Sequence, residues 1–131
     1  MKKNNNGFSL VELIIVIAIM AVLVGVLAPQ FIKYVEQSRR SRDIATAQEV
    51  REAVLADIAD GVITNGTSLT ASTGTPSSLG DTPTASATIC KGQSFVATYN
   101  VTSGTCSVKI GSRSEDLTTE SGASAYKAAT S

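Results

Sequence analysis

Hydrophobic residues are distributed very unevenly along this chain. From Phe8 to Leu27 the sequence is an apolar run in which Glu12 is the only ionisable residue. At about 1.5 Å per helical residue, such a run is roughly 30 Å long, which is the thickness of a bilayer's hydrocarbon core. The pattern therefore predicts a helix that can span a membrane. A carboxylate inside a span costs about 2.5–3.5 kcal/mol, so we expect Glu12 to lie near an interface or to have a cationic partner.

Beyond Pro29 the pattern becomes that of an amphipathic helix. The apolar residues that recur at steps of three and four are Ile32, Val35, Ile44, Ala47, Val50, Val54 and Ile58. This period places them on one helix face, on which we expect a sheet to cover Ala47, Val50, Val54 and Ile58. Pro29 lacks an N–H and crowds the carbonyl of Gly25, so a kink or a locally unwound turn is expected there. Gly61 is the expected helix stop, because glycine readily adopts positive φ at the C′ position.

The C-terminal half alternates in the manner of β-strands. We predict a short strand at residues 87–90 and longer strands at 94–101 and 105–110, with Thr102-Ser103-Gly104 as a hairpin loop. A three-stranded antiparallel meander laid on the helix stripe is the economical arrangement, because a hairpin alone is barely stable. The predicted fold class is therefore α+β, with a long N-terminal helix (about residues 8–60) packed on a small antiparallel sheet of about three strands.

Two stretches of the C-terminal half lack a clear period. Residues 64–88 are rich in Thr, Ser, Gly and Pro and are expected to form a loop. Residues 111–131 are polar and weakly patterned. We expect them to form a loosely held tail that returns Tyr126 to the surface of the sheet.

Cys90 and Cys106 bracket the middle predicted strand. They can pair if this part of the chain lies outside the cytoplasm, and a disulfide closing such a loop contributes about 3 kcal/mol. Pairing is our expectation, and two buried free thiols are the alternative. In a simple meander the first and third strands are not neighbours, so a pair requires cysteines near the strand ends or a different strand order.

The balance of charge does not indicate a particular partner, and the chain has few of the residue types used in catalysis. Lys+Arg and Asp+Glu each number 11, which gives no indication of a nucleic-acid partner. The chain has no His, which excludes Ser-His-Asp and Cys–His catalytic arrangements. The carboxylates show no pattern specific for acid–base chemistry. We therefore expect no enzyme, no catalytic residues, no cofactor and no metal.

Charged residues are dense just after Pro29. Glu36 with Arg40, and Arg39 with Asp43, are spaced four residues apart, and we expect both pairs on the solvent side, worth a few tenths of a kcal/mol each. The run of residues 39–42 is best explained as a solvated face paired with acids of the same or a neighbouring subunit. Contact with anionic lipid headgroups is the alternative.

The start of the chain carries a recognisable motif. Residues 1–6 form a short basic polar leader, Gly7 precedes Phe8, and Glu12 is the fifth residue of a chain that would begin at Phe8. This arrangement, which directly abuts the apolar run, resembles the N-terminus of type IV pilins and the related pseudopilins. The resemblance is close up to about Pro29 and architectural from there to the end of the predicted helix.

The resemblance implies processing by a prepilin peptidase/methylase. Residues 1–7 would be removed as a leader on the cytoplasmic side, and Phe8 would then be N-methylated. The new amino group of Phe8 carries a positive charge near neutral pH and lies one helical turn from Glu12. There it can neutralise the carboxylate within one chain, or set the register between neighbouring chains.

The resemblance also implies that successive segments of the mature chain have different roles. Residues 8–29 would be the transmembrane and filament-core helix, residues 30–60 its amphipathic half, and residues 61–131 a small globular head. Pro29 stands where members of the family loosen the helix on packing into a fibre, and a plain kink without a role in assembly is the alternative. Some relatives linked to secretion bind calcium in loops beside the sheet, which would make Asp81, Glu115 and Asp116 candidate ligands, but their spacing does not require such a site.

The implied function is that of a structural subunit of a type IV pilus-like filament used for adhesion, twitching motility or surface contact. Its partners would be further copies in a helical filament, an inner-membrane assembly platform with its ATPase, and membrane lipid before assembly. The subunit would cross the cytoplasmic membrane once with its head outside, and then join a cell-surface or periplasmic filament. The alternatives are a pseudopilin of a type II secretion system or of a competence DNA-uptake apparatus, and a membrane-anchored adhesin that never polymerises.

One observation argues against this orientation. Four basic residues follow the span, namely Lys33, Arg39, Arg40 and Arg42, and basic residues are usually enriched on the cytoplasmic side. We give the motif precedence, because the leader must face its peptidase.

Overall fold

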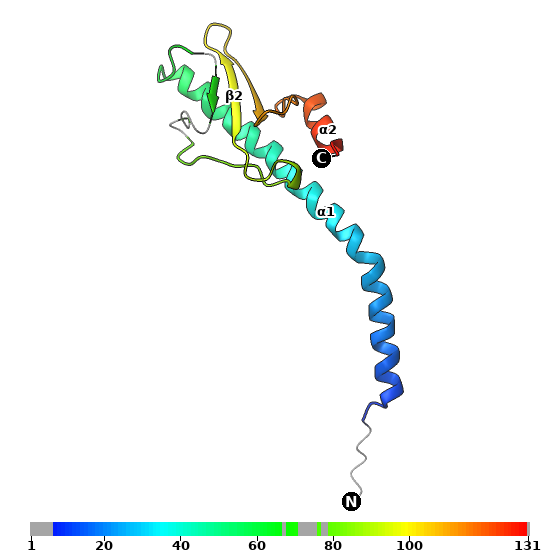
Figure 1. The fold of residues 1–131 in the computed structure, drawn as a ribbon. Helices are drawn as coiled ribbons and strands as arrows, with labels where there is room; N and C mark the ends of the chain where they lie inside the picture. The colour runs from blue at the N-terminus through cyan, green and yellow to red at the C-terminus, as the bar shows by residue number, and fades with distance from the viewer. Residues whose placement is uncertain (1–6, 67, 71–75, 77–78, 131) are drawn as a thin grey trace, which may run out of the picture. The chain divides into compact units, whose positions relative to one another are not determined.

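The computed structural model describes residues 7–66, 68–70, 76 and 79–130. Its elements are α1 (Leu10–Ala59), β1 (Ser68–Thr70), the 3₁₀ helix η1 (Thr88–Cys90), β2 (Phe95–Asn100), β3 (Thr105–Ile110) and α2 (Glu120–Ala128). Figure 1 shows them in chain order. The chain divides into two compact units, Met1–Val35 and Glu36–Ser131, and the second is called the head unit below. The predicted α+β class is confirmed.

Helix α1 has 50 residues and its helical assignment continues through Pro29, so the locally unwound turn is not found. The predicted stop at Gly61 is confirmed. Gly61 has φ 75°, its N–H donates to the Ile58 carbonyl (3.2 Å), and the Val62 N–H donates to the Asp57 carbonyl (2.9 Å). These two bonds are those of a Schellman motif, which satisfies the last carbonyls of the helix.

The sheet has the order β1-β2-β3, and both of its strand pairs are antiparallel. Side chains on one face of β2 and β3 are buried, as the alternating pattern predicts. They are Phe95, Ala97, Tyr99, Cys106, Val108 and Ile110. This face forms one hydrophobic core with Ala47, Val50 and Val54 of α1, so the predicted packing of the helix stripe against the sheet is confirmed.

The first predicted strand, residues 87–90, is wrong. Residues 88–90 form η1, and the first strand of the sheet is β1, which lies in the stretch predicted to be a loop. The reason is that the backbone donors of this segment are taken by side chains of α1. The Asp43 carboxylate accepts the N–H groups of residues 86 and 87, and Glu36 accepts that of Thr88. These groups are therefore unavailable to a sheet ladder.

The predicted loose tail is also wrong, because residues 120–128 form α2. Thr119 caps this helix, with its hydroxyl oxygen accepting the Gly122 N–H at 3.2 Å. Tyr126 belongs to the same hydrophobic core as the buried face of β2 and β3. It is fully buried, and the guanidinium of Arg113 lies 5.8 Å from the centre of its ring, within cation–π range.

Candidate functional site

The residues of the N-terminal motif lie at the start of α1. Phe8 is 93 % exposed, and a Cβ added to Gly7 would meet no atom within 4 Å. Among the described residues, none lies where it would hinder a protein that approaches the backbone between Gly7 and Phe8.

Ser9 and Glu12 form a reciprocal pair at the beginning of α1. The Ser9 N–H donates to a Glu12 carboxylate oxygen at 2.8 Å, and the Glu12 N–H donates to the Ser9 hydroxyl oxygen at 3.3 Å. This is a capping box, in which two helix donors that lack intrahelical partners are satisfied together. Our sequence analysis missed it, although Ser-x-x-Glu before an apolar run is its signature. The bond also turns the Glu12 carboxylate back toward the Phe8 end of the helix.

The first unit exposes its apolar side chains. Between Leu10 and Leu27 the exposed fractions of the large apolar side chains range from 46 % at Val16 to 76 % at Leu10. Among the described residues, α1 is the one helix long and apolar enough to cross a membrane, and none of its most apolar window is buried. Such a surface requires a partner other than water.

The head unit contains a polar cluster of three α1 residues, Glu36, Arg40 and Asp43, which we call the α1 polar cluster. Arg40 is only 7 % exposed. Its Nη1 atom donates to the carbonyls of Tyr126 (3.1 Å), Lys127 (2.8 Å) and Ala129 (2.7 Å). A cation thus meets the carbonyls at the end of α2, where the helix dipole also favours positive charge. Two of these carbonyls have a second donor: the Ala129 N–H donates to Tyr126, and Gln37 Nε2 donates to Lys127.

Asp43 is 1 % exposed, and its carboxylate accepts hydrogen bonds from two separate segments of the head unit. Its Oδ1 accepts from the Ser86 N–H and hydroxyl, both at 2.7 Å, and its Oδ2 accepts from the Ala87 N–H at 3.0 Å. The Tyr126 hydroxyl also donates to Oδ2 at 2.7 Å. Since this hydroxyl has one hydrogen, the Cys90 thiol, 2.8 Å away, must be the donor to the Tyr126 oxygen.

Glu36 completes the cluster. Its carboxylate accepts from the Thr88 N–H at 3.0 Å and from the Thr88 hydroxyl at 2.7 Å, and Arg40 Nε lies 3.4 Å from it. Partial burial acts to raise the pKa of Glu36, but the hydrogen bonds from Thr88 and Arg40 outweigh it and leave the pKa below its usual value.

The sequence interpretation of these charges is only partly right. The Glu36–Arg40 pair is confirmed, but Arg40 is buried instead of solvated. The predicted Arg39–Asp43 pair is not formed. Arg39 lies 4.0 Å from Glu36 instead, because the Asp43 carboxylate faces inward to Ser86, Ala87 and Tyr126. The partners of the cluster come from 43 to 89 residues further along the chain, and a pattern of four-residue spacing cannot reveal them.

The expected disulfide is absent, since Cys90 and Cys106 are buried free thiols. Cys90 is bonded to the Gln93 N–H just before β2, whereas Cys106 is paired with Tyr99 near the end of that strand. Six strand residues span roughly 20 Å, and a disulfide requires Cα atoms within about 7 Å. Burial raises the pKa of Cys106 to about 11, and burial, more than any other cause, also raises the pKa of Cys90.

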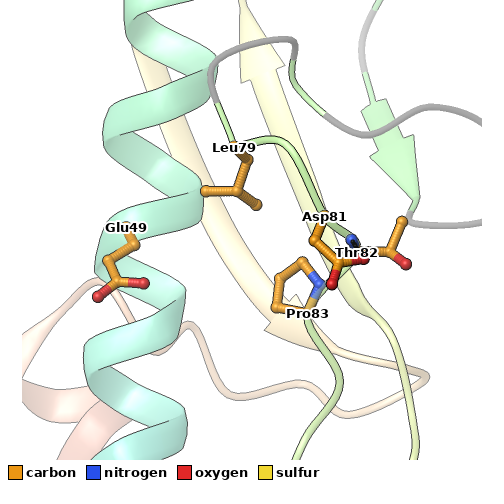
Figure 2. Close-up of a pocket in the computed structure, with 5 residues that line it drawn as sticks. All are labelled: Glu49, Leu79, Asp81, Thr82 and Pro83. Carbon is orange, nitrogen blue, oxygen red and sulfur yellow. Dashed lines mark hydrogen bonds between the residues drawn. The ribbon is translucent and has the colours of Figure 1, made fainter.

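The three carboxylates considered for calcium are not brought together. Asp81 lines an open hollow of about 250 Å³, in which it lies across from Glu49 (Figure 2). Asp116 lines a different hollow, and Glu115 pairs with Arg113 at 2.9 Å. Within the described ranges, no group of three or more His, Cys, Asp or Glu side chains could hold a metal ion.

Comparison with known proteins gives matches to parts of the chain. Residues 2–28 match the family model of the prokaryotic N-terminal methylation motif. A stretch of 61 residues is 36 % identical to the type IV major fimbrial protein FimA of Dichelobacter nodosus, covering 47 % of this chain and 39 % of that protein. A stretch of 64 residues is 39 % identical to a probable minor fimbrial protein of the same organism, covering 49 % and 40 %. The chain thus spans about two fifths of these relatives' length. No solved structure matches it.

Proposed function

We propose that this chain, which carries the methylation motif of type IV pilins and is related in sequence to type IV fimbrial proteins, is a structural subunit of a type IV pilus-like filament. In this proposal it is held in the cytoplasmic membrane by the first half of α1 before assembly. The observation that carries the proposal is the direct junction of the Gly7–Phe8 motif with a long exposed apolar helix.

The apolar surface supports a role in assembly. Removal of apolar area from water is worth about 25 cal/mol per Å², so a helix that exposes large apolar side chains over five turns is strongly driven to find lipid or other helices. A membrane satisfies this surface in the single subunit, and neighbouring copies of α1 satisfy it in a fibre. The same segment can therefore serve first as an anchor and then as a filament core.

Processing is part of the proposal. A prepilin peptidase would cut between Gly7 and Phe8, and methylation of the new amino group would follow. The exposure of Phe8 and the open surroundings of Gly7 are compatible with such a cut. The amino group would then lie beside Ser9, toward which the capping box already turns Glu12.

The charge of Glu12 would determine assembly. In a packed fibre core, the Phe8 amino group and the Glu12 carboxylate of neighbouring subunits would be excluded from water. At contact distance and an effective dielectric constant of about 20, their attraction is roughly 4 kcal/mol before desolvation is subtracted. Loss of one partner leaves the other charge buried without a counter-charge.

The capping box allows a sharp test of this role. Glu12→Gln keeps a side chain that can complete a capping box but removes the charge, whereas Ser9→Ala removes the capping bond and keeps the charge. We expect cells that express Glu12→Gln as their sole subunit to hold it in the membrane but to shed few or no filaments. Ser9→Ala should reach the membrane and form filaments.

The readout is the number and length of sheared filaments, measured at matched membrane levels of the subunit. Normal filaments from Glu12→Gln would refute the electrostatic role. Loss of filaments in Ser9→Ala alone would assign Glu12 to helix capping. A wild-type chain that stays in the membrane fraction and never enters sheared material, in a host with a complete assembly machinery, would contradict the filament proposal and indicate a non-polymerising anchored protein.

A further inference from the structure

Exposed basic side chains surround one end of the head unit. They are Arg39 of α1, Lys91 directly after η1, and Lys127 of α2, and together we call them the basic collar. Arg39 is placed beside η1 by the contact of its Nη1 with the Thr88 hydroxyl at 3.5 Å. Lys127 is placed beside the same turns of α1, because its carbonyl accepts from Gln37 Nε2 at 3.3 Å and from Arg40 Nη1 at 2.8 Å.

Among the described residues, two of the three side chains of the basic collar have no acid within ion-pair distance. In the described part of the chain no ion pair involves Lys91 or Lys127, and Arg39 lies 4.0 Å from Glu36, whose carboxylate also binds Arg40 and Thr88. Asp43 is buried at 1 % exposure. The exposed acids of α1 in the head unit come later in the helix, at Glu49, Glu52 and Asp60. The head unit therefore has a basic end, formed where the chain enters it, and an acidic stretch further along α1.

The position of Arg39 in the sequence connects the basic collar to the anchor. Arg39 follows Tyr34 by five residues in α1. Phe31 and Tyr34 are 67 % and 73 % exposed, and exposed aromatic residues at the end of an apolar span are typical of the membrane–water interface. The next one to two turns of such a helix lie at the level of the lipid headgroups.

We infer that the basic collar binds the anionic headgroups of the leaflet from which the span emerges, while the subunit is still in the membrane. The inference rests on the membrane anchoring in the proposed function. Clustered Lys and Arg beside a span attract anionic lipid, and the attraction decays within a Debye length. The buried Arg40 takes no part, so the lipid-binding set is not the sequence run 39–42 but residues that the fold collects from three elements.

Lysine labelling tests the contact directly. The full chain is reconstituted into nanodiscs of phosphatidylcholine, or of an equal mixture of phosphatidylcholine and phosphatidylglycerol, and its lysines are acetylated with a neutral reagent. The negative surface potential keeps a larger share of nearby amines protonated, so Lys91 and Lys127 should react roughly threefold more slowly in the anionic discs. Lys109, on the solvent side of β3, serves as the internal control and should react at one rate in both, and high salt should remove the difference.

Two variants sharpen the test. Arg39→Gln should reduce the lipid-dependent slowing at Lys91 and Lys127, whereas Arg51→Gln, which removes a charge from the same helix further along the head, should leave it unchanged. Equal rates in the two lipids would overturn the inference. Slowing in both lipids that grows with the number of copies per disc would overturn it in favour of contact with a second subunit. A chain that does not enter nanodiscs at all would refute the membrane anchoring, and the lipid contact with it.

Discussion

Replacement of Arg40 by alanine should release α2 from the head unit without unfolding the rest of it. Arg40 is the one described side chain that donates to three carbonyls in the last turn of α2 and after it, and it also pairs with Glu36. Its loss removes the charged donor from all three carbonyls, of which Tyr126 and Lys127 keep one other donor each. The Glu36 carboxylate is left with the more distant Arg39, at 4.0 Å. The hydrophobic stripe of α1 and the face of β2 and β3 are untouched by the change.

The structure sets the size of the effect. Breaking a buried charge interaction by removal of one partner costs about 3–5 kcal/mol. The three Arg40 bonds to carbonyls share one nitrogen, and the Glu36 side chain is 21 % exposed, so we place the loss at the lower end of that range. About 3 kcal/mol corresponds to a rise of roughly 100-fold in the population with α2 detached.

The two free thiols report this detachment separately from global unfolding. Cys90 is covered by Tyr126 of α2, whose hydroxyl lies 2.8 Å from its sulfur, whereas Cys106 is buried within the sheet. In Arg40→Ala, the reaction of Cys90 with a thiol reagent should accelerate by roughly 100-fold, while Cys106 should remain slow. Each rate is measured on the full chain in detergent, with the other cysteine replaced by serine.

Arg42→Ala is the matched control, since Arg42 is an exposed neighbour on the same helix, and it should leave both rates nearly unchanged. If Cys90 reacts equally fast in Arg40→Ala and in the parent chain, Arg40 does not hold α2. If both thiols accelerate together, the residue stabilises the whole unit and α2 is not a separable element.

Three further outcomes are expected. Intact-mass analysis of assembled material should show a chain that begins at Phe8, and Gly7→Val should leave the leader attached; retained leader in assembled wild-type material would contradict the proposed cut. The lowered pKa of Glu36 means that its stabilising contribution is complete above pH 4.5 and is lost as the pH falls through the folded pKa, so Glu36→Gln should flatten the acid end of an unfolding titration. The pKa of Cys106, raised from 9 to about 11, predicts that this thiol alone causes a loss of about 2–3 kcal/mol of stability between pH 9 and 11. Cys106→Ala should remove this share and leave the share of Cys90 and Tyr126, whose pKa values are also raised; an unchanged alkaline slope in that variant would show that Cys106 does not contribute to the loss.

Local periodicity was enough to predict the core of the head unit. The stripe of α1 and the buried faces of β2 and β3 follow from spacings of three, four and two residues, which are properties of single elements. Val50 and Val108, for example, lie in the core for reasons visible within a few residues of each. The helix stop at Gly61 is local in the same sense, because it depends on the conformational freedom of one glycine.

The errors have a common physical origin in side chains that act on distant backbone. Residues 87–90 have the composition of a strand, but the N–H groups of Ala87 and Thr88 are satisfied by Asp43 and Glu36 from the middle of α1. The polar, weakly patterned C-terminal stretch was predicted to be a loosely held tail, but its helix is held in place by Arg40 and by the buried Tyr126. No window of the sequence contains both partners of any of these bonds.

The capping box at Ser9 and Glu12 is a different kind of omission. Its signal was local, but the charge of Glu12 in an apolar run led us to expect a cationic partner, the Phe8 amino group of the same or a neighbouring chain, and not a backbone N–H. The structure gives the carboxylate an intramolecular bond as well. An account of assembly must therefore separate what the charge does for neighbouring chains from what the side chain does for its own helix.

The two free thiols change what the head unit requires from its surroundings. A disulfide between Cys90 and Cys106 would have tied the segment before β2 to β3 and would have required an oxidising compartment. In its place, the α1 polar cluster ties that same segment and the C-terminal helix to α1 through buried hydrogen bonds. Such bonds need no oxidant, but each depends on its full set of partners, because a buried polar group left unpaired costs about 1–3 kcal/mol. The head unit is thus expected to tolerate reducing conditions and to be sensitive to single substitutions at Arg40 and Asp43.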